Sequence, residues 1–223
     1  GLVQDELGRV DNAIDNIEKS IALMERLLAQ DTANIKFVRF ILSSKQRLAL
    51  LRAFAGNFAE ARQSMDALEE EWQRYFEGVP ADEFNLDEAY TSYLVDRAWL
   101  ASAMDDPGAA VQLLQTAMTR SLDELRKYPG NRGAGNLLML AAFRYWEVKQ
   151  ALPEETILMN LPYYYSSSGQ IKACFDASLA ARKAIMLGDK NRADELTDYL
   201  MQKGFAEVTF MRACKANSFC NGR

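Results

Sequence analysis

The sequence contains no histidine and only three cysteines among its 223 residues. Histidine is the side chain most often used for proton transfer near neutral pH and the commonest metal ligand, so its absence argues against most hydrolase triads and zinc sites. The sequence also shows no glycine-rich phosphate loop, no carboxylate pair at a catalytic spacing and no set of metal ligands. It therefore predicts a protein that is not an enzyme and that holds no cofactor and no metal.

Long apolar runs are also lacking, because no stretch approaches the roughly 20 residues that a membrane span needs. The formal net charge is −5, from 31 acidic and 26 basic residues, and such a field repels a phosphate backbone and an anionic membrane surface. We expect this segment to contact neither nucleic acid nor membrane. With 49% hydrophobic residues it can still bury a substantial core.

The cysteines lie toward the C-terminus, at Cys174, Cys214 and Cys220, without a C-x-x-C pair. Two alternatives are open. They are either buried small side chains and surface thiols, or two of them form a disulfide, which requires an oxidising compartment.

Helical periodicity dominates the sequence, and hairpin signals of the β type are absent. Apolar residues recur at three-and-four spacing, as in Val10, Ala13, Ile14, Ile17 and Ile21. The sequence predicts an all-α fold of about nine to ten helices. The expected spans are Val10–Leu28, Ile35–Ala55, Phe58–Phe76, Leu86–Met104, Pro107–Tyr128, Gly135–Gln150, a short Glu154–Met159, Ile171–Leu187, Lys190–Lys203 and Phe205–Asn217.

Breaks between helices recur at nearly equal intervals. Those that begin at Gly8, Gly56, Asp105 and Leu152 lie 48, 49 and 47 residues apart, and Gly188 follows after 36. Equal spacing of helix pairs is typical of a stacked solenoid, because one pair cannot bury its apolar face alone. The one stretch without helical character lies within an irregular insertion at about 153–170, which contains a Tyr-Tyr-Tyr-Ser-Ser-Ser run.

The residues at these breaks resemble the tetratricopeptide repeat, in which a Gly-Asp/Asn-aromatic turn is followed by an alanine. Gly56-Asn57-Phe58-Ala59-Glu60-Ala61 is the nearest copy, and looser copies begin at Gly8, Asp105 and Gly188. The turn needs a residue that tolerates unusual φ, and the alanine lets the two helices of a pair approach. The resemblance implies a right-handed superhelical solenoid of antiparallel helix pairs that acts as a protein-protein interaction scaffold.

The chain enters a helical pattern at Leu2, and its first turn precedes the second helix of a pair. We therefore expect residues 1–223 to form a single tetratricopeptide-like domain that is a fragment of a larger protein. The closing segment, with Gly204-Phe205 and Phe210-Met211-Arg212-Ala213-Cys214, resembles the repeat regions of bacterial membrane-anchored winged-helix regulators and eukaryotic-like Ser/Thr kinases. That resemblance implies a periplasmic location; a cytoplasmic one is the alternative.

Tetratricopeptide arrays bind extended peptides in the groove lined by the first helix of each pair, so the resemblance places a groove on these helices. Aromatic residues and arginine dominate binding hot spots, and each candidate could instead pack between layers. The tyrosine run could close the groove as a lid or simply patch an incomplete repeat. The candidate groove residues are Gln46, Leu50, Phe54, Tyr90, Tyr93, Arg97, Asn136, Arg144, Tyr145 and Tyr164.

Three functions are therefore weighed from the sequence. The first is a non-catalytic scaffold that binds a peptide or a partner domain on its concave face. The second is a ligand-sensing domain of a membrane-anchored transcriptional regulator or kinase. The third is self-association, such as a homodimer, through an unpaired helix; an apolar patch on the helix from Val10 to Leu28 would indicate it.

Overall fold

The protein is all-helical in the parts that its computed structural model describes, which are residues 10–32, 34–77, 85–162, 174–205 and 207–216. The prediction of an all-α fold is confirmed. None of the described helices is both long and apolar enough to cross a membrane. The described helices are α2 (Val10–Gln30), α3 (Ile35–Phe54), α4 (Phe58–Glu77), α5 (Asn85–Ala103), α6 (Pro107–Lys127), α7 (Arg132–Lys149), α8 (Glu155–Met159), α9 (Cys174–Met186), α10 (Lys190–Gln202) and α11 (Val208–Ala216).

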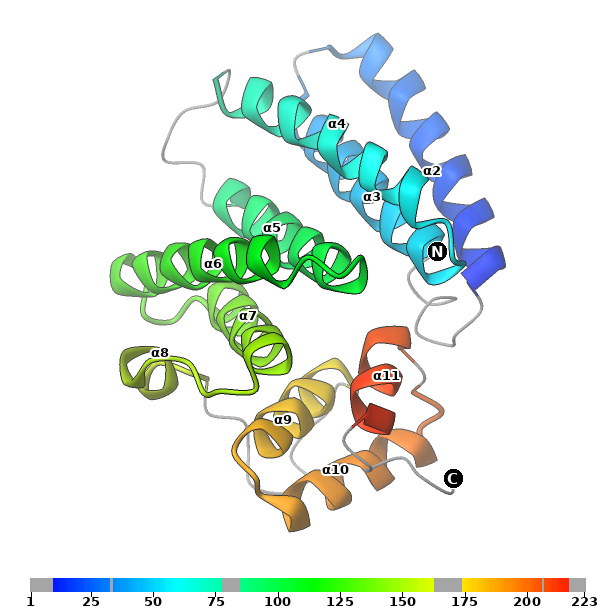
Figure 1. Ribbon diagram of the computed structural model, residues 1–223. Coiled ribbons are helices and arrows are strands. Elements are labelled where there is room, and N and C mark those ends of the chain that lie inside the picture. Colours follow the sequence, from blue (N-terminus) through cyan, green and yellow to red (C-terminus); the bar gives the residue numbers. More distant parts are fainter. Residues whose placement is uncertain (1–9, 33, 78–84, 163–173, 206, 217–223) are drawn as a thin grey trace.

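The helices contact one another in chain order. α3 contacts α5, α5 contacts α7, and α7 contacts α9, while α4, α6 and α10 each pack against the helix that precedes them. Figure 1 shows the result as an arc, with α2 to α4 at one end, α5 to α7 in the middle and α9 to α11 at the other end. The main core runs through this series of contacts and includes Trp72, Tyr93 and Phe143, all fully buried.

Three of the recurrent breaks share one backbone geometry, whereas at the predicted break at Leu152 the helix α7 ends with the cap residue Gln150, whose N–H donates to Trp146 O, four residues back, at 2.8 Å. Gly56, Asp105 and Gly188 have φ values of +96°, +63° and +74°, in the left-handed region that lets a helix end and the chain reverse. Asp105 shows that the geometry persists where the glycine is replaced. At each of these three breaks the second residue of the turn donates its N–H to a carbonyl five residues back: Asn57 to Arg52 at 2.9 Å, Asp106 to Ala101 at 3.0 Å, Asp189 to Ala184 at 2.9 Å, and similarly Phe205 to Leu200 at 3.0 Å.

The alanines that follow these turns are completely buried. Ala61, Ala110 and Ala193 each have no exposed surface, and neither does Ala13 near the start of α2. Ala49, Ala98 and Ala181, which lie in the helices before these turns, are buried as well. Each pair of helices therefore packs through small side chains near its turn.

Two predicted helix starts are wrong, each for a local reason. α7 begins at Arg132 rather than Gly135, because the Asn131 side chain accepts a hydrogen bond from Ala134 N at 3.1 Å and caps the helix earlier. α11 begins at Val208 rather than Phe205, because Phe205 N–H closes the turn after Gly204, whose φ is +68°. α6 begins at the predicted residue, Pro107, and Asp106 caps it by accepting a hydrogen bond from Ala109 N at 3.0 Å.

The insertion at about 153–170 contributes to the core in its first part. Ile157 of α8 and Leu161 are buried in the main core, and Pro162 O accepts a hydrogen bond from Lys183 Nζ at 2.9 Å. The tyrosine run, including Tyr164, lies outside the described residues. On the described length of α2, Leu23 is 46% exposed, and Ile14, Met24 and Leu28 are partly buried.

We predict that Gly135→Ala destabilises the protein. A Cβ at this position would lie 2.9 Å from Cγ of the Pro162 ring, which cannot swing aside. We expect a loss of about 1–3 kcal/mol in the free energy of unfolding, measured by urea denaturation, despite the helix propensity of alanine. Gly108→Ala in α6 is the matched control, because its nearest atom would lie at an ordinary 3.8 Å. Equal stability of the two variants would contradict this packing.

Candidate functional site

A cavity lies along the alternate helices of the arc. It has a volume of about 680 Å³ and is lined by residues of α3, α5, α7 and α9 together with Phe205, Glu207 and Thr209. Within the described parts of the chain, its lining holds no residue of α4, α6 or α10. We call it the central cavity. Its walls are formed by Arg39, Ser43, Gln46, Arg47, Leu50, Glu88, Ala89, Ser92, Val95, Asp96, Trp99, Gly133, Asn136, Leu137, Leu140, Arg144, Phe175, Arg182, Phe205, Glu207 and Thr209.

The lining follows helical spacing on each helix. On α3, Arg39, Ser43, Gln46 and Leu50 stand four, three and four residues apart, which places them on one face. The lining residues of α5 and α7 repeat this pattern. Because these helices are covered by neighbours on their other sides, this face is the one that can keep polar side chains in contact with water.

A short hydrogen bond joins α3 to α5 on the cavity wall. Gln46 Nε2 donates to Asp96 Oδ2 at 2.6 Å, and Gln46 is itself 5% exposed. Burial raises the pKa of the Asp96 carboxyl, while the hydrogen bond from Gln46 and the nearby Arg47 and Arg144 act in the opposite direction. Gln46 therefore positions an acid in the cavity wall rather than reaching freely into the cavity.

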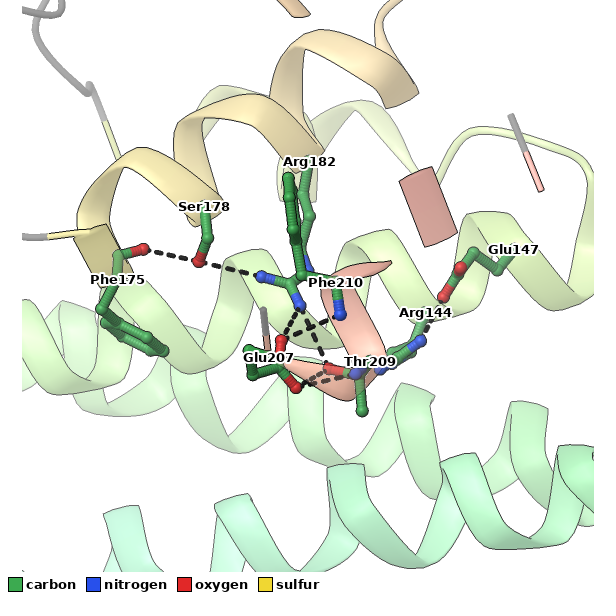
Figure 2. Close-up of polar contacts among 8 residues, drawn as sticks. All are labelled: Arg144, Glu147, Phe175, Ser178, Arg182, Glu207, Thr209 and Phe210. Carbon is green, nitrogen blue, oxygen red and sulfur yellow. Dashed lines mark hydrogen bonds and ion pairs between the residues drawn. The ribbon is translucent and has the colours of Figure 1, made fainter. Parts of the chain in front are cut away.

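Arg182 anchors the other end of the cavity (Figure 2). This side chain is 2% exposed, and its guanidinium donates to Ser178 Oγ at 3.0 Å, Glu207 Oε2 at 2.8 Å and Thr209 Oγ1 at 3.1 Å. It also lies over the Phe210 ring, 5.3 Å from the centroid. Arg182 thus ties α9 to the start of α11.

Glu207 completes this connection by capping α11. Its carboxylate accepts hydrogen bonds from Thr209 N at 3.0 Å and Phe210 N at 2.9 Å, as well as from the Thr209 hydroxyl. Burial works against ionisation, but Arg182 and the Thr209 hydrogen bond outweigh it and lower the pKa of Glu207 to about 2. Glu207 therefore stays ionised at neutral pH and holds the helix start against Arg182.

The middle of the cavity carries a second arginine. Arg144 Nη1 donates to Glu147 Oε2 on its own helix at 2.6 Å (Figure 2). Arg144 also lowers the pKa of both Asp96 and Glu207 through its charge. One nitrogen of Arg144 thus binds a carboxylate of its own helix, α7. Its positive charge also favours the ionised forms of Asp96 on α5 and of Glu207 before α11.

α11 folds back against the far end of the arc. The Arg212 guanidinium lies 5.3 Å from the Phe54 ring centroid and 5.6 Å from that of Trp99, and these two rings meet edge to face at 4.7 Å. Because Phe54 ends α3 and Trp99 lies on α5, this contact joins the C-terminal helix to the N-terminal half. It bounds the central cavity beside Trp99.

A second cavity adjoins the first and shares Arg39 and Ser43 with it. Its volume is about 440 Å³, and its other lining residues are Met24, Lys36, Phe37 and Phe40. We call it the side cavity. Phe40 is 43% exposed, so an aromatic surface stands open beside the Arg39 guanidinium.

Four of the candidate residues line the central cavity: Gln46, Leu50, Asn136 and Arg144. They come from α3 and α7, so the structure brings together residues that lie about 90 positions apart. Leu50 lies in the cavity wall, although only 2% of its surface is exposed. Phe54 does not line the cavity but packs against Trp99 at its end.

The α5 candidates lie elsewhere, at the interface with α4. Tyr93 is fully buried and donates to Met65 O at 2.8 Å, while Tyr90 and Arg97 both bind Glu69, at 2.7 and 2.8 Å. Burial, then the hydrogen bond to Glu69, raises the pKa of Tyr90 to about 12. Tyr145 packs against the main core. Tyr164 lies outside the described residues.

Several cavity residues were not among the candidates. Arg39, Arg47, Asp96, Arg182 and Glu207 supply most of the charge. Arg39, Arg47 and Asp96 could have been found from the sequence, because they belong to polar stripes at three-and-four spacing on helices that are otherwise apolar. Glu207 has no such signal, since it precedes its helix.

Cys214 in α11 is disulfide-bonded, and Cys174 is a free thiol; Cys220 lies outside the described residues. Within the described parts of the chain, no group of three or more cysteine, aspartate or glutamate side chains is placed to hold a metal ion.

Comparison with protein families, curated proteins and solved structures gives no match to this chain.

We predict that Glu207→Gln destabilises the protein by roughly 3–5 kcal/mol at pH 7, because it leaves the buried Arg182 charge without its counter-ion. Glu195→Gln is the matched control: its partner Arg192 is bound at an exposed site, so we expect under about 1 kcal/mol. Urea denaturation followed by circular dichroism measures both. Equal effects would show that the Arg182 pair is not structural.

The same pair predicts a dependence on pH. The folded pKa of Glu207 is about 2, below its ordinary 4.5, so its stabilisation is complete above pH 4.5 and is lost as pH falls toward 2. The wild type should therefore lose roughly 3 kcal/mol more than Glu207→Gln between pH 6 and pH 2. Parallel curves for the two proteins would contradict the lowered pKa.

Proposed function

We propose that this chain is a non-catalytic interaction domain that binds an extended peptide segment of a partner along the central cavity. The observation that carries the proposal is the origin of the lining: four alternate helices in chain order each contribute a face. A ligand that touches all four must be elongated along the arc. A peptide in extended conformation has this shape, at roughly 3.3 Å per residue.

We further propose that the helix pairs form a right-handed superhelical stack of the tetratricopeptide type. The repeated left-handed turns at Gly56, Asp105 and Gly188 and the buried alanines after them support it. In such a stack the first helices of the pairs line the inner face, which agrees with the cavity lining.

Two acidic groups of the cavity support binding rather than catalysis, because each is held by other residues of the protein. Glu207 is bound to Arg182 and caps a helix, and Asp96 is held by Gln46. Both acids therefore serve in the wall of the site.

A sensory domain that binds a small molecule is the second candidate. A cavity of about 680 Å³ falls within the range of small-molecule sites, and its Arg182 end is lined by buried charges. The disulfide at Cys214 supports an oxidising compartment such as the periplasm for either function.

Filling the central cavity tests the proposal. Ser43 is exposed at the junction of both cavities, so Ser43→Trp should obstruct a ligand without disturbing the core; Gln115→Trp on the outer helix α6 is the matched control. Dodecapeptides selected from a random displayed library on the wild type are titrated against each protein by fluorescence anisotropy. We expect Ser43→Trp to bind the selected peptides about tenfold or more weakly than the wild type, and Gln115→Trp to bind them with unchanged affinity.

Failure to select any peptide, or equal binding to Ser43→Trp and wild type, would contradict peptide binding along this cavity. A thermal-shift screen of small metabolites separates the second candidate. The sensor would be favoured if no peptide is selected and a small molecule raises the melting temperature of the wild type but not that of Ser43→Trp.

A further inference from the structure

The side cavity differs in charge from the protein as a whole. Its described lining holds two cations, Lys36 and Arg39, and no carboxylate, whereas the chain carries a net charge of −5. Like charges held together without acids between them attract an anionic ligand and repel a basic one.

Arg39 lies at the junction, because it lines both cavities. It forms no ion pair or hydrogen bond through its side chain with any residue of the described chain. Other surface arginines of the molecule are engaged, such as Arg52, which binds Glu18 at 2.9 Å and Glu60 at 2.8 Å. The guanidinium of Arg39 can therefore donate two parallel hydrogen bonds to a ligand carboxylate.

A further donor is unused deeper in the central cavity. Arg182 is 2% exposed, and its Nε has no hydrogen-bond partner in the part of the chain that is described. A buried donor without a partner costs free energy unless an acceptor reaches it.

The side cavity also offers an apolar contact beside the cation. Met24, Phe37 and Phe40 form this surface, and the 43% exposure of Phe40 leaves it accessible. Exposed aromatic and methionine side chains next to an arginine are typical of the centre of a binding hot spot.

Building on the proposed function, we infer that the partner segment is acidic: an Asp or Glu side chain binds Arg39, and an apolar side chain beside it contacts the Phe37, Phe40 and Met24 surface. The peptide then continues into the central cavity toward Arg144 and Arg182. Its carboxylate would displace only water at Arg39, since no protein acid competes there among the described residues.

Matched peptides test this inference. A fluorescein-labelled dodecapeptide that carries one Asp next to a Leu, within an Ala-Ser host, is compared with the same peptide carrying Asn. We expect the Asp peptide to bind about tenfold more tightly, as befits one hydrogen bond to a charged group. The preference should weaken at 0.5 M NaCl because salt screens an exposed pair.

Variants then locate the preference. Arg39→Gln should abolish the difference in affinity between the Asp and Asn peptides. Phe40→Ala should lower the affinity for both peptides by the same factor. Arg126→Gln, on the outer helix α6 with a side chain that is 69% exposed, should leave both unchanged. Circular dichroism spectra confirm that each variant is folded.

Two outcomes would overturn the inference. If Asp and Asn peptides bind equally and Ser43→Trp blocks both, the chain binds peptides but not through an acidic residue, and the proposed function stands alone. If succinate binds as tightly as the acidic peptide and shows the same loss in Arg39→Gln, the occupant is a small carboxylate and not a peptide. Absence of binding by every peptide would instead refute the proposed function itself.

Discussion

The left-handed turn that ends α3, α5 and α9 is the constraint on which the rest of the structure depends. It reverses the chain within two residues and fixes the start of the next helix through a hydrogen bond that reaches five residues back. A fully buried alanine then sets how closely the two helices of a pair approach, at Ala61, Ala110 and Ala193. α3, α5 and α7 contact one another in succession, and each exposes one face to the same cavity.

This arrangement also decides where polar side chains can lie on the inner helices. Each is covered by its pair partner and by the inner helices before and after it, so a polar residue must either bind a neighbour or face the cavity. Tyr93 and Arg97 take the first course and bind residues of α4. Arg39 and Ser43 take the second. Residue type alone did not distinguish these cases, since both sets are polar or amphipathic and lie on inner helices.

Periodicity and turn chemistry predicted the helices and their breaks because both are local properties of the chain. The start of α7 was predicted three residues too late. The capping hydrogen bond of Asn131 stabilises a helix from Arg132 onward, which outweighs the low helix propensity of Gly133 and Gly135. Gln46, Leu50, Asn136 and Arg144 were predicted from their place on the inner helices, and they do line the cavity. Glu207 could not be predicted, because its role arises only when α9 brings Arg182 to the segment before α11. That contact joins residues 25 positions apart through a turn and a helix.

The distribution of charge across the two cavities follows from the cost of burial. Arg182 is deep, so it requires Glu207, and their charges cancel within the wall. Arg39 is shallower and can remain solvated without a partner among the described residues, so its charge is available at the surface. An unpaired cation is inexpensive only where water reaches it, and that is also where a ligand can arrive. The opening of the site therefore carries net positive charge while its depth is close to neutral, which directs an acidic group to the Arg39 end and leaves the interior to uncharged parts of the ligand.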